Sequence, residues 1–178
     1  MSYDRRTLAS DSPWAVGAAL LMILAAIMML AVLPQRLADE SAGIGMTLLP
    51  LLPSAACICT AVMLVSRKNS LIPTALPVGT VCLYAAAHSL GGALWASLIC
   101  CLIGTALAAL YLLAVAGTLS TRTPLLAVCT AAAVWTLVTL PRFYGGASMG
   151  TVLAGLAPAL IYAALFLVGC GMRRGRLY

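Results

Sequence analysis

Charged side chains are scarce in this sequence. Only 8% of its 178 residues are Asp, Glu, Lys or Arg, whereas a soluble domain has about 25%. Hydrophobic residues make up 63%, against roughly 45–50% in soluble domains. This composition excludes an ordinary soluble protein and leaves no room for a separate soluble catalytic domain. It predicts a single integral membrane domain over residues 1–178.

Long apolar stretches dominate what is present. A helix needs about 20 residues to cross about 30 Å of hydrocarbon, and six stretches come close to that length. The first is too long for the apolar core of a secretory signal, which has about 7–15 residues, so we expect it to remain as a membrane helix. The prediction is an all-α, polytopic helical bundle with spans at about 13–33, 45–65, 71–89, 93–116, 124–140 and 150–169.

None of these six stretches contains Asp, Glu, Lys or Arg. Ionisable residues inside a membrane are costly and usually mark proton relays or ion paths. Their absence argues against a proton-coupled antiporter or a pump of the usual carboxylate design. It also argues against a membrane hydrolase, which needs a base beside its nucleophile. We therefore predict no catalytic residues and no enzyme.

The sequence has little that could bind a metal or a cofactor. It has one histidine, His88, and no Cys-x-x-Cys. That excludes a bis-His haem and a zinc site of the usual spacing, so we predict no metal and no cofactor. Cys57 and Cys59 are two positions apart, which places them on nearly opposite helix faces. The seven cysteines are interpreted as packing residues: Cys57, Cys59, Cys82, Cys100, Cys101, Cys129 and Cys170.

The ten basic residues alternate in number between the segments that flank the spans. Eight fall in odd-numbered segments and two, Arg36 and Arg142, in even-numbered ones. Cytoplasmic loops carry the excess of Lys and Arg, so both termini are expected in the cytoplasm and the protein in the cytoplasmic membrane. The net charge of +6 is explained by topology and contact with anionic lipids. A nucleic-acid partner is not expected, because no basic patch on a soluble face is predicted.

Most of the remaining polar chemistry gathers on the predicted outer side. A vestibule formed by these side chains would bind a small polar or anionic solute. The alternative interpretation is that the prolines and arginines there only end the helices, and that the arginine side chains reach to lipid headgroups. The candidate substrate-binding residues are Arg36, Asp39, Glu40, His88, Arg142 and Tyr144.

Small residues at spacing four predict close helix contacts, because they let helix backbones approach in lipid. Such lines are Ala93, Ser97, Cys101 and Cys100, Gly104, Ala108 in the fourth span, and Gly155, Ala159, Ala163 in the sixth. Prolines also fall within spans, where each frees a carbonyl four residues earlier. They mark either kinks beside a cavity or ordinary membrane-helix prolines: Pro50, Pro53, Pro73, Pro77 and Pro158.

Two functions fit this architecture. In size, number of spans and internal termini the chain resembles the substrate-binding components of energy-coupling-factor transporters, although no substrate motif of that family can be aligned. The resemblance implies a transport-related subunit that binds a small solute from outside and works with other membrane subunits. The alternative is a non-transporting scaffold or accessory subunit whose small-residue faces pack against partner helices. The lipid bilayer is a partner in both.

Overall fold

The computed structural model describes residues 13–38, 44–66, 71–89, 94–118 and 149–174. Every regular element in these ranges is an α-helix, which confirms the all-α prediction. The fifth predicted span, 124–140, lies outside the described residues. The helices are α1 (Pro13–Leu30), α2 (Leu33–Ala38), α3 (Ile44–Leu48), α4 (Leu51–Val65), α5 (Leu71–Ser89), α6 (Leu94–Val115) and α8 (Met149–Arg174).

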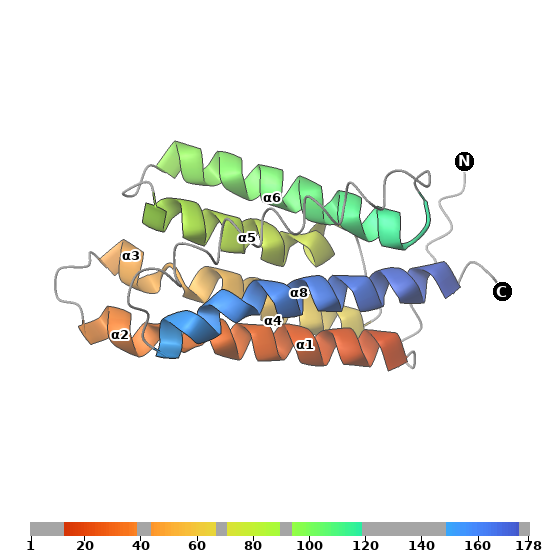
Figure 1. The fold of residues 1–178 in the computed structure, drawn as a ribbon, viewed down its shortest axis with the longest axis horizontal. Helices are drawn as coiled ribbons and strands as arrows, with labels where there is room; N and C mark the ends of the chain where they lie inside the picture. Colours follow the sequence, from red (N-terminus) through yellow and green to blue (C-terminus); the bar gives the residue numbers. More distant parts are fainter. Residues whose placement is uncertain (1–12, 39–43, 67–70, 90–93, 119–148, 175–178) are drawn as a thin grey trace.

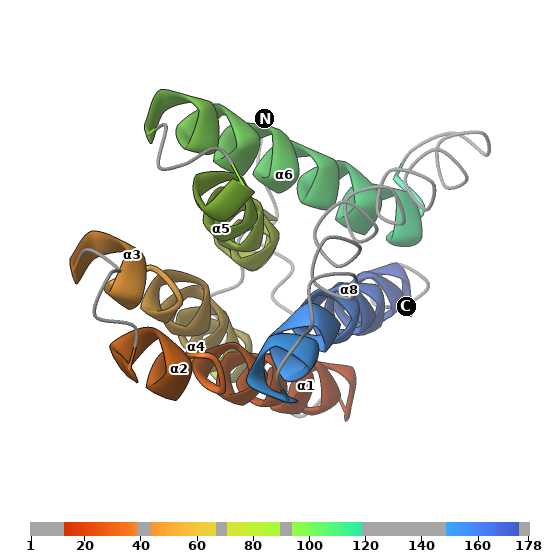
Figure 2. The same cartoon turned by 60° about the vertical axis from the view of Figure 1, so that its left-hand side comes forward.

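The five longer helices lie side by side as a bundle (Figure 1). The most extensive contacts join α5 to α6, α1 to α8, and α1 to α4. Helix α4 also packs on α5, and α8 also reaches α6 and α5. Seen from the side, the helices follow one another around the bundle in the order α6, α5, α4, α1 and α8 (Figure 2).

Contacts between α6 and α8 show that these two helices are parallel. The ring of Tyr111 in α6 packs edge-on against that of Tyr162 in α8, with 5.4 Å between the centroids. Further along both helices, Gly117 after α6 lies beside the side chain of Arg173 in α8. Because both contacts advance in the same sense along the chain, α6 and α8 run in the same direction.

Helix α5 runs against α6. Gly79 of α5 lies against Thr105 of α6, and Cys82, further along α5, lies against Gly104. Helix α5 therefore ends at the opposite end of the bundle from Arg173. Figure 1 shows α2, α3 and the start of α8 at that same end. We call it the α2 end, and the opposite end the Arg173 end.

Three helical stretches are long and apolar enough to cross a membrane: Pro13–Gln35, Leu94–Val115 and Val152–Arg173. Two shorter apolar helices accompany them, Leu51–Val65 and Leu71–Ala87. The 15 residues of α4 span only about 22 Å, less than the hydrocarbon thickness of about 30 Å. The described residues thus define a membrane-associated helical bundle with three candidate spans.

Many large apolar side chains lie on the outside of the bundle. On α6, Leu94, Trp95 and Leu102 are each about 70–80% exposed. The interior is instead rich in alanine, as at Ala18, Ala25, Ala75, Ala108 and Ala157, each fully buried. In lipid, large apolar residues gain nothing by leaving the hydrocarbon, while small residues allow helices to approach. This distribution is what a bilayer favours.

Prolines explain where two predicted spans are interrupted. Pro34 has no N–H for the Leu30 carbonyl four residues earlier, and α1 ends at Leu30 before the chain resumes as α2. Within the predicted span 45–65 the structure has a turn at Leu49 and Pro50, which separates α3 from α4. At the far end of the chain, α8 continues past the predicted residue 169 to Arg174.

Small residues at helix contacts were predicted correctly for α6 and only partly for α8. Ser97, Gly104 and Ala108 are buried, while Cys100 and Cys101 are partly buried; Ala93 lies outside the described residues.

In α8 the predicted line was wrong beyond Gly155, because Ala159 and Ala163 are exposed. The buried small residues there are Ala154, Ala157 and Ala164.

Candidate functional site

The predicted outer residues fall partly within the structure. Arg36 is in α2, a short helix, and not in a loop as predicted. His88 is in the last turn of α5, as predicted. Both helix segments lie at the α2 end of the bundle (Figure 1). The other four candidates, Asp39, Glu40, Arg142 and Tyr144, lie outside the described residues. The helical framework thus brings two of the six candidates to one end.

Inside the bundle, side-chain hydroxyl groups donate hydrogen bonds to backbone carbonyls. The carbonyl of Pro73 has no donor within α5, because the residue four positions later is Pro77. The hydroxyl of Thr60 in α4 donates to that carbonyl at 3.0 Å. A bond between helices thus replaces the one that proline removes, as the low polarity of a membrane requires. This contact joins α4 to α5.

Ser54 makes a second such link. Its hydroxyl lies 3.1 Å from the Pro50 carbonyl, at the start of α4, and 3.2 Å from the Ala26 carbonyl of α1. Thr80 and Thr105 donate within their own helices, to Pro77 and Cys101. All four hydroxyls therefore bind helix backbone carbonyls, as serine and threonine side chains in helices commonly do.

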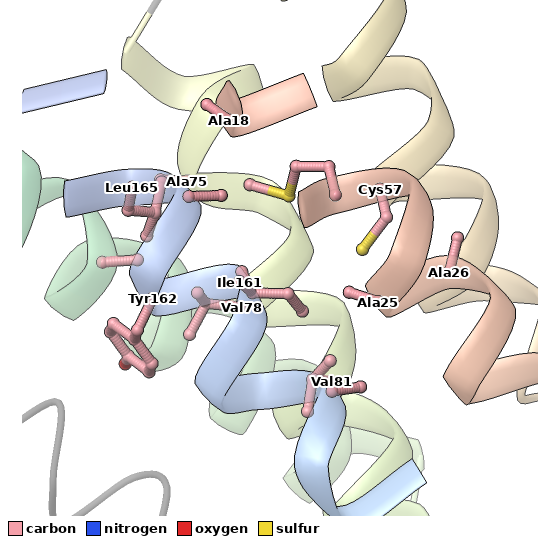
Figure 3. Packing of buried hydrophobic residues seen from close by; sticks show 14 of the residues in the cluster. Ala18, Ala25, Ala26, Cys57, Ala75, Val78, Val81, Ile161, Tyr162 and Leu165 are labelled. Carbon is pink, nitrogen blue, oxygen red and sulfur yellow. The ribbon is translucent and has the colours of Figure 1, made fainter. Parts of the chain in front are cut away.

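Among the described residues, one buried hydroxyl has no hydrogen-bond partner. Tyr162 is near the middle of α8 and only 9% exposed, and its buried hydroxyl makes no hydrogen bond. Figure 3 shows Ile161 and Tyr162 leaving α8 in different directions. Tyr162 was not among the functional residues predicted from the sequence. The available signal was its position, because tyrosine in membrane helices is usually found at the interface and not at mid-span.

Two glycines bring α5 and α6 into unusually close contact. A Cβ added to Gly104 would come within 2.6 Å of the Cys82 sulfur and 3.3 Å of the Gly79 Cα. A Cβ added to Gly79 would overlap the Thr105 hydroxyl. Backbones this close are typical of small-residue packing in membranes. This contact is structural, and it holds Cys82 between the two helices.

Metal ligands are sparse in the described ranges. No group of three His, Cys, Asp or Glu residues there is close enough to hold a metal ion. Cys57 is buried and Cys59 exposed, which confirms that they lie on different faces of α4. Cys129 lies outside the described residues.

Comparisons with known proteins add no assignment: no family model, no curated protein and no solved structure matches this chain.

Proposed function

We propose that this chain is a six-span protein of the cytoplasmic membrane, with both termini in the cytoplasm, and that it is a transport-related subunit binding a small polar solute at the α2 end. The observation that carries the proposal is that Arg36 and His88 belong to helices at that end. A cation and an imidazole at the rim of an otherwise apolar bundle are suited to a polar solute.

The direction of the helices supports the six-span topology. Because α6 and α8 are parallel, an odd number of crossings has to separate them, and the predicted span at 124–140 supplies one.

The basic residues support the orientation of the bundle. In the sequence, Arg67 and Lys68 fall between the end of α4 and the start of α5. Arg173 is exposed in the last turn of α8, at the end of the bundle where α5 begins. An excess of Lys and Arg marks the cytoplasmic side, which makes the α2 end the outer one.

The interrupted helices at the α2 end also favour a binding role. Helix α2 follows a turn after α1, and α3 is separated from α4 by the turn at Leu49 and Pro50. Helix breaks free backbone groups, and membrane transporters bind solutes at such discontinuities. Short helices that touch each other, as α2 and α3 do, provide such groups beside Arg36.

The test is solute uptake and binding by the full chain. Arg36→Ala, His88→Ala and Arg142→Ala are compared in proteoliposomes with radiolabelled glycerol, amino acids and phosphate. Loss of a charge-assisted hydrogen bond is expected to weaken binding about tenfold or more. Arg173→Ala, which removes an exposed arginine from the other end, is the matched control and should bind normally. If all three variants bind every solute as the unmodified protein does, there is no binding site at this end.

Partner capture separates this proposal from the alternative of a non-transporting scaffold. Co-purification with a nucleotide-binding subunit supports transport, because a chain with so few ionisable groups needs an external energy source. Co-purification with a larger membrane complex that contains no transporter supports the scaffold.

A further inference from the structure

The unpartnered hydroxyl of Tyr162 is costly where it lies. The atom is buried and makes no hydrogen bond, whereas most buried hydroxyls have a partner. Its ring is held edge-on against Tyr111 at 5.4 Å between centroids. Leaving a polar group unpaired in an apolar interior is unfavourable. A leucine or phenylalanine at this position would avoid the cost of a buried, unpaired hydroxyl. The presence of a tyrosine there therefore suggests that its hydroxyl has a function.

A free acceptor lies nearby on the same helix. Pro158 is inside α8 and has no N–H, so the carbonyl of Ala154, four residues earlier, loses its helical donor. Ala154 is 1% exposed. The carbonyl of Pro73 in α5 also loses its helical donor, because Pro77 follows four residues later, and it accepts a hydrogen bond from the Thr60 hydroxyl of α4. Within the described ranges no side-chain hydroxyl does this for Ala154.

The third observation concerns Gly155 of α8, where a side chain would have room. Gly155 is buried, yet a Cβ built on it would meet no atom of the described residues within 4 Å. The other interior glycines, such as Gly79, Gly104 and Gly169, would each meet an atom closer than 3 Å. Gly155 precedes Tyr162 by seven residues, or two helical turns of about 10.5 Å, so both occupy one side of α8. The unobstructed position at Gly155 therefore lies on the same side of α8 as Tyr162, nearer to the α2 end.

The charge of the surroundings limits what could bind there. The described ranges contain no Asp or Glu, and their Lys and Arg are confined to Arg36 in α2 and to Arg173 and Arg174 in the last turn of α8. A charged solute at mid-depth would have no counter-ion among these residues, and burying an unpaired charge is prohibitive. An uncharged molecule has no such penalty.

We propose that the side of α8 between Ala154 and Tyr162 binds a small uncharged solute that accepts a hydrogen bond from the Tyr162 hydroxyl and donates one to the Ala154 carbonyl. Alcohols and primary amides have both groups. This inference rests on the proposed function, because it names the class of solute that passes from the α2 end into the bundle. It adds a second site, at mid-depth, to the one at the rim.

Binding of defined probes tests the interior site. The full chain in nanodiscs is dialysed against radiolabelled glycerol and acetamide, with acetate as the charged counterpart of acetamide. Glycerol and acetamide should bind saturably, and acetate should not. Tyr162→Phe keeps the ring and removes only the hydroxyl, so binding should weaken about fivefold, as expected for one hydrogen bond. Pro158→Ala returns an N–H to the Ala154 carbonyl and should weaken binding similarly. Tyr84→Phe, at a buried tyrosine of α5, is the matched control and should bind normally.

Two results would overturn the interior site: no saturable binding of glycerol or acetamide, or equal binding by the unmodified protein and both α8 variants. If Tyr162→Phe raises thermal stability and leaves binding unchanged, the interior site is also overturned, because the hydroxyl would then only destabilise the fold. The rim variants distinguish this failure from that of the proposed function. If Arg36→Ala, His88→Ala and Arg142→Ala are silent while Tyr162→Phe weakens binding, only the rim site is lost. If the rim variants weaken binding and Tyr162→Phe does not, only the interior site is lost.

Discussion

The contact between α5 and α6 makes Gly79→Ala a sensitive test of the packing. The added methyl group would overlap the Thr105 hydroxyl and come within 2.7 Å of the Cys101 carbonyl oxygen. The Thr105 side chain can rotate, but the carbonyl belongs to the backbone of α6 and cannot. Ordinary contact begins at 3.4 Å, so the two helices would have to separate locally by about 0.7 Å, and contacts along the seam would weaken.

Two opposing effects set the size of this change. Replacing glycine by alanine within a helix is favourable by about 0.5–1 kcal/mol. Overpacking a well-filled contact costs about 1–3 kcal/mol. Because the obstacle at Gly79 is partly backbone, we expect the cost to lie in the upper part of that range, for a net loss of about 1–2 kcal/mol. Gly155→Ala is the matched control, since its methyl group meets no atom of the described residues within 4 Å and should keep the favourable term.

The assay is reversible unfolding of the purified protein in mixed micelles, followed by circular dichroism as the fraction of denaturing detergent rises. Gly79→Ala should unfold at a lower fraction than the unmodified protein, and Gly155→Ala at an equal or higher one. If the two variants are equally stable, the close approach of α5 and α6 is not real, and the reasoning from glycine contacts fails with it.

Two further predictions concern a bond between helices and the topology. Thr60→Val should lower the unfolding free energy by about 0.6–1.7 kcal/mol, the range for such bonds in membranes, because the Pro73 carbonyl loses its donor. In a Pro77→Ala background, where the backbone regains an N–H for that carbonyl, the same change should cost less; an equal cost would contradict the proposed exchange of donors. For topology, single cysteines are introduced in a cysteine-free chain at the exposed positions Ser66 and Gly45. An impermeant maleimide should label Gly45→Cys on intact cells and Ser66→Cys only after permeabilisation, and labelling of both from one side would exclude the proposed orientation.

The helical class and the limits of several helices follow from the sequence. The predicted span 71–89 matches α5 (Leu71–Ser89), and 93–116 differs from α6 (Leu94–Val115) by one residue at each end. These limits are local properties, since apolar runs end where charge, glycine or proline begins. The position of His88 at the end of α5 was predictable for the same reason.

Other features depend on neighbours that a single chain segment does not specify. Many lines of small residues at spacing four exist in an alanine-rich helix, so spacing alone selected Ala159 and Ala163 in α8. In the structure these two are exposed, and Ala157 and Ala164 are buried instead. Pro77 in the sequence indicates that the Pro73 carbonyl lacks its helical donor. Only the position of α4 shows that the Thr60 hydroxyl donates a hydrogen bond to that carbonyl.

Hydropathy and length alone indicate a membrane-associated helical protein, because the transfer of each stretch into hydrocarbon depends on its own residues. The pairing of helices, the face that each one buries and the unpaired Tyr162 hydroxyl at mid-depth were decided only by the tertiary structure. They depend on which atoms meet across helices, and in a sequence so uniformly apolar, composition does not distinguish one face from another.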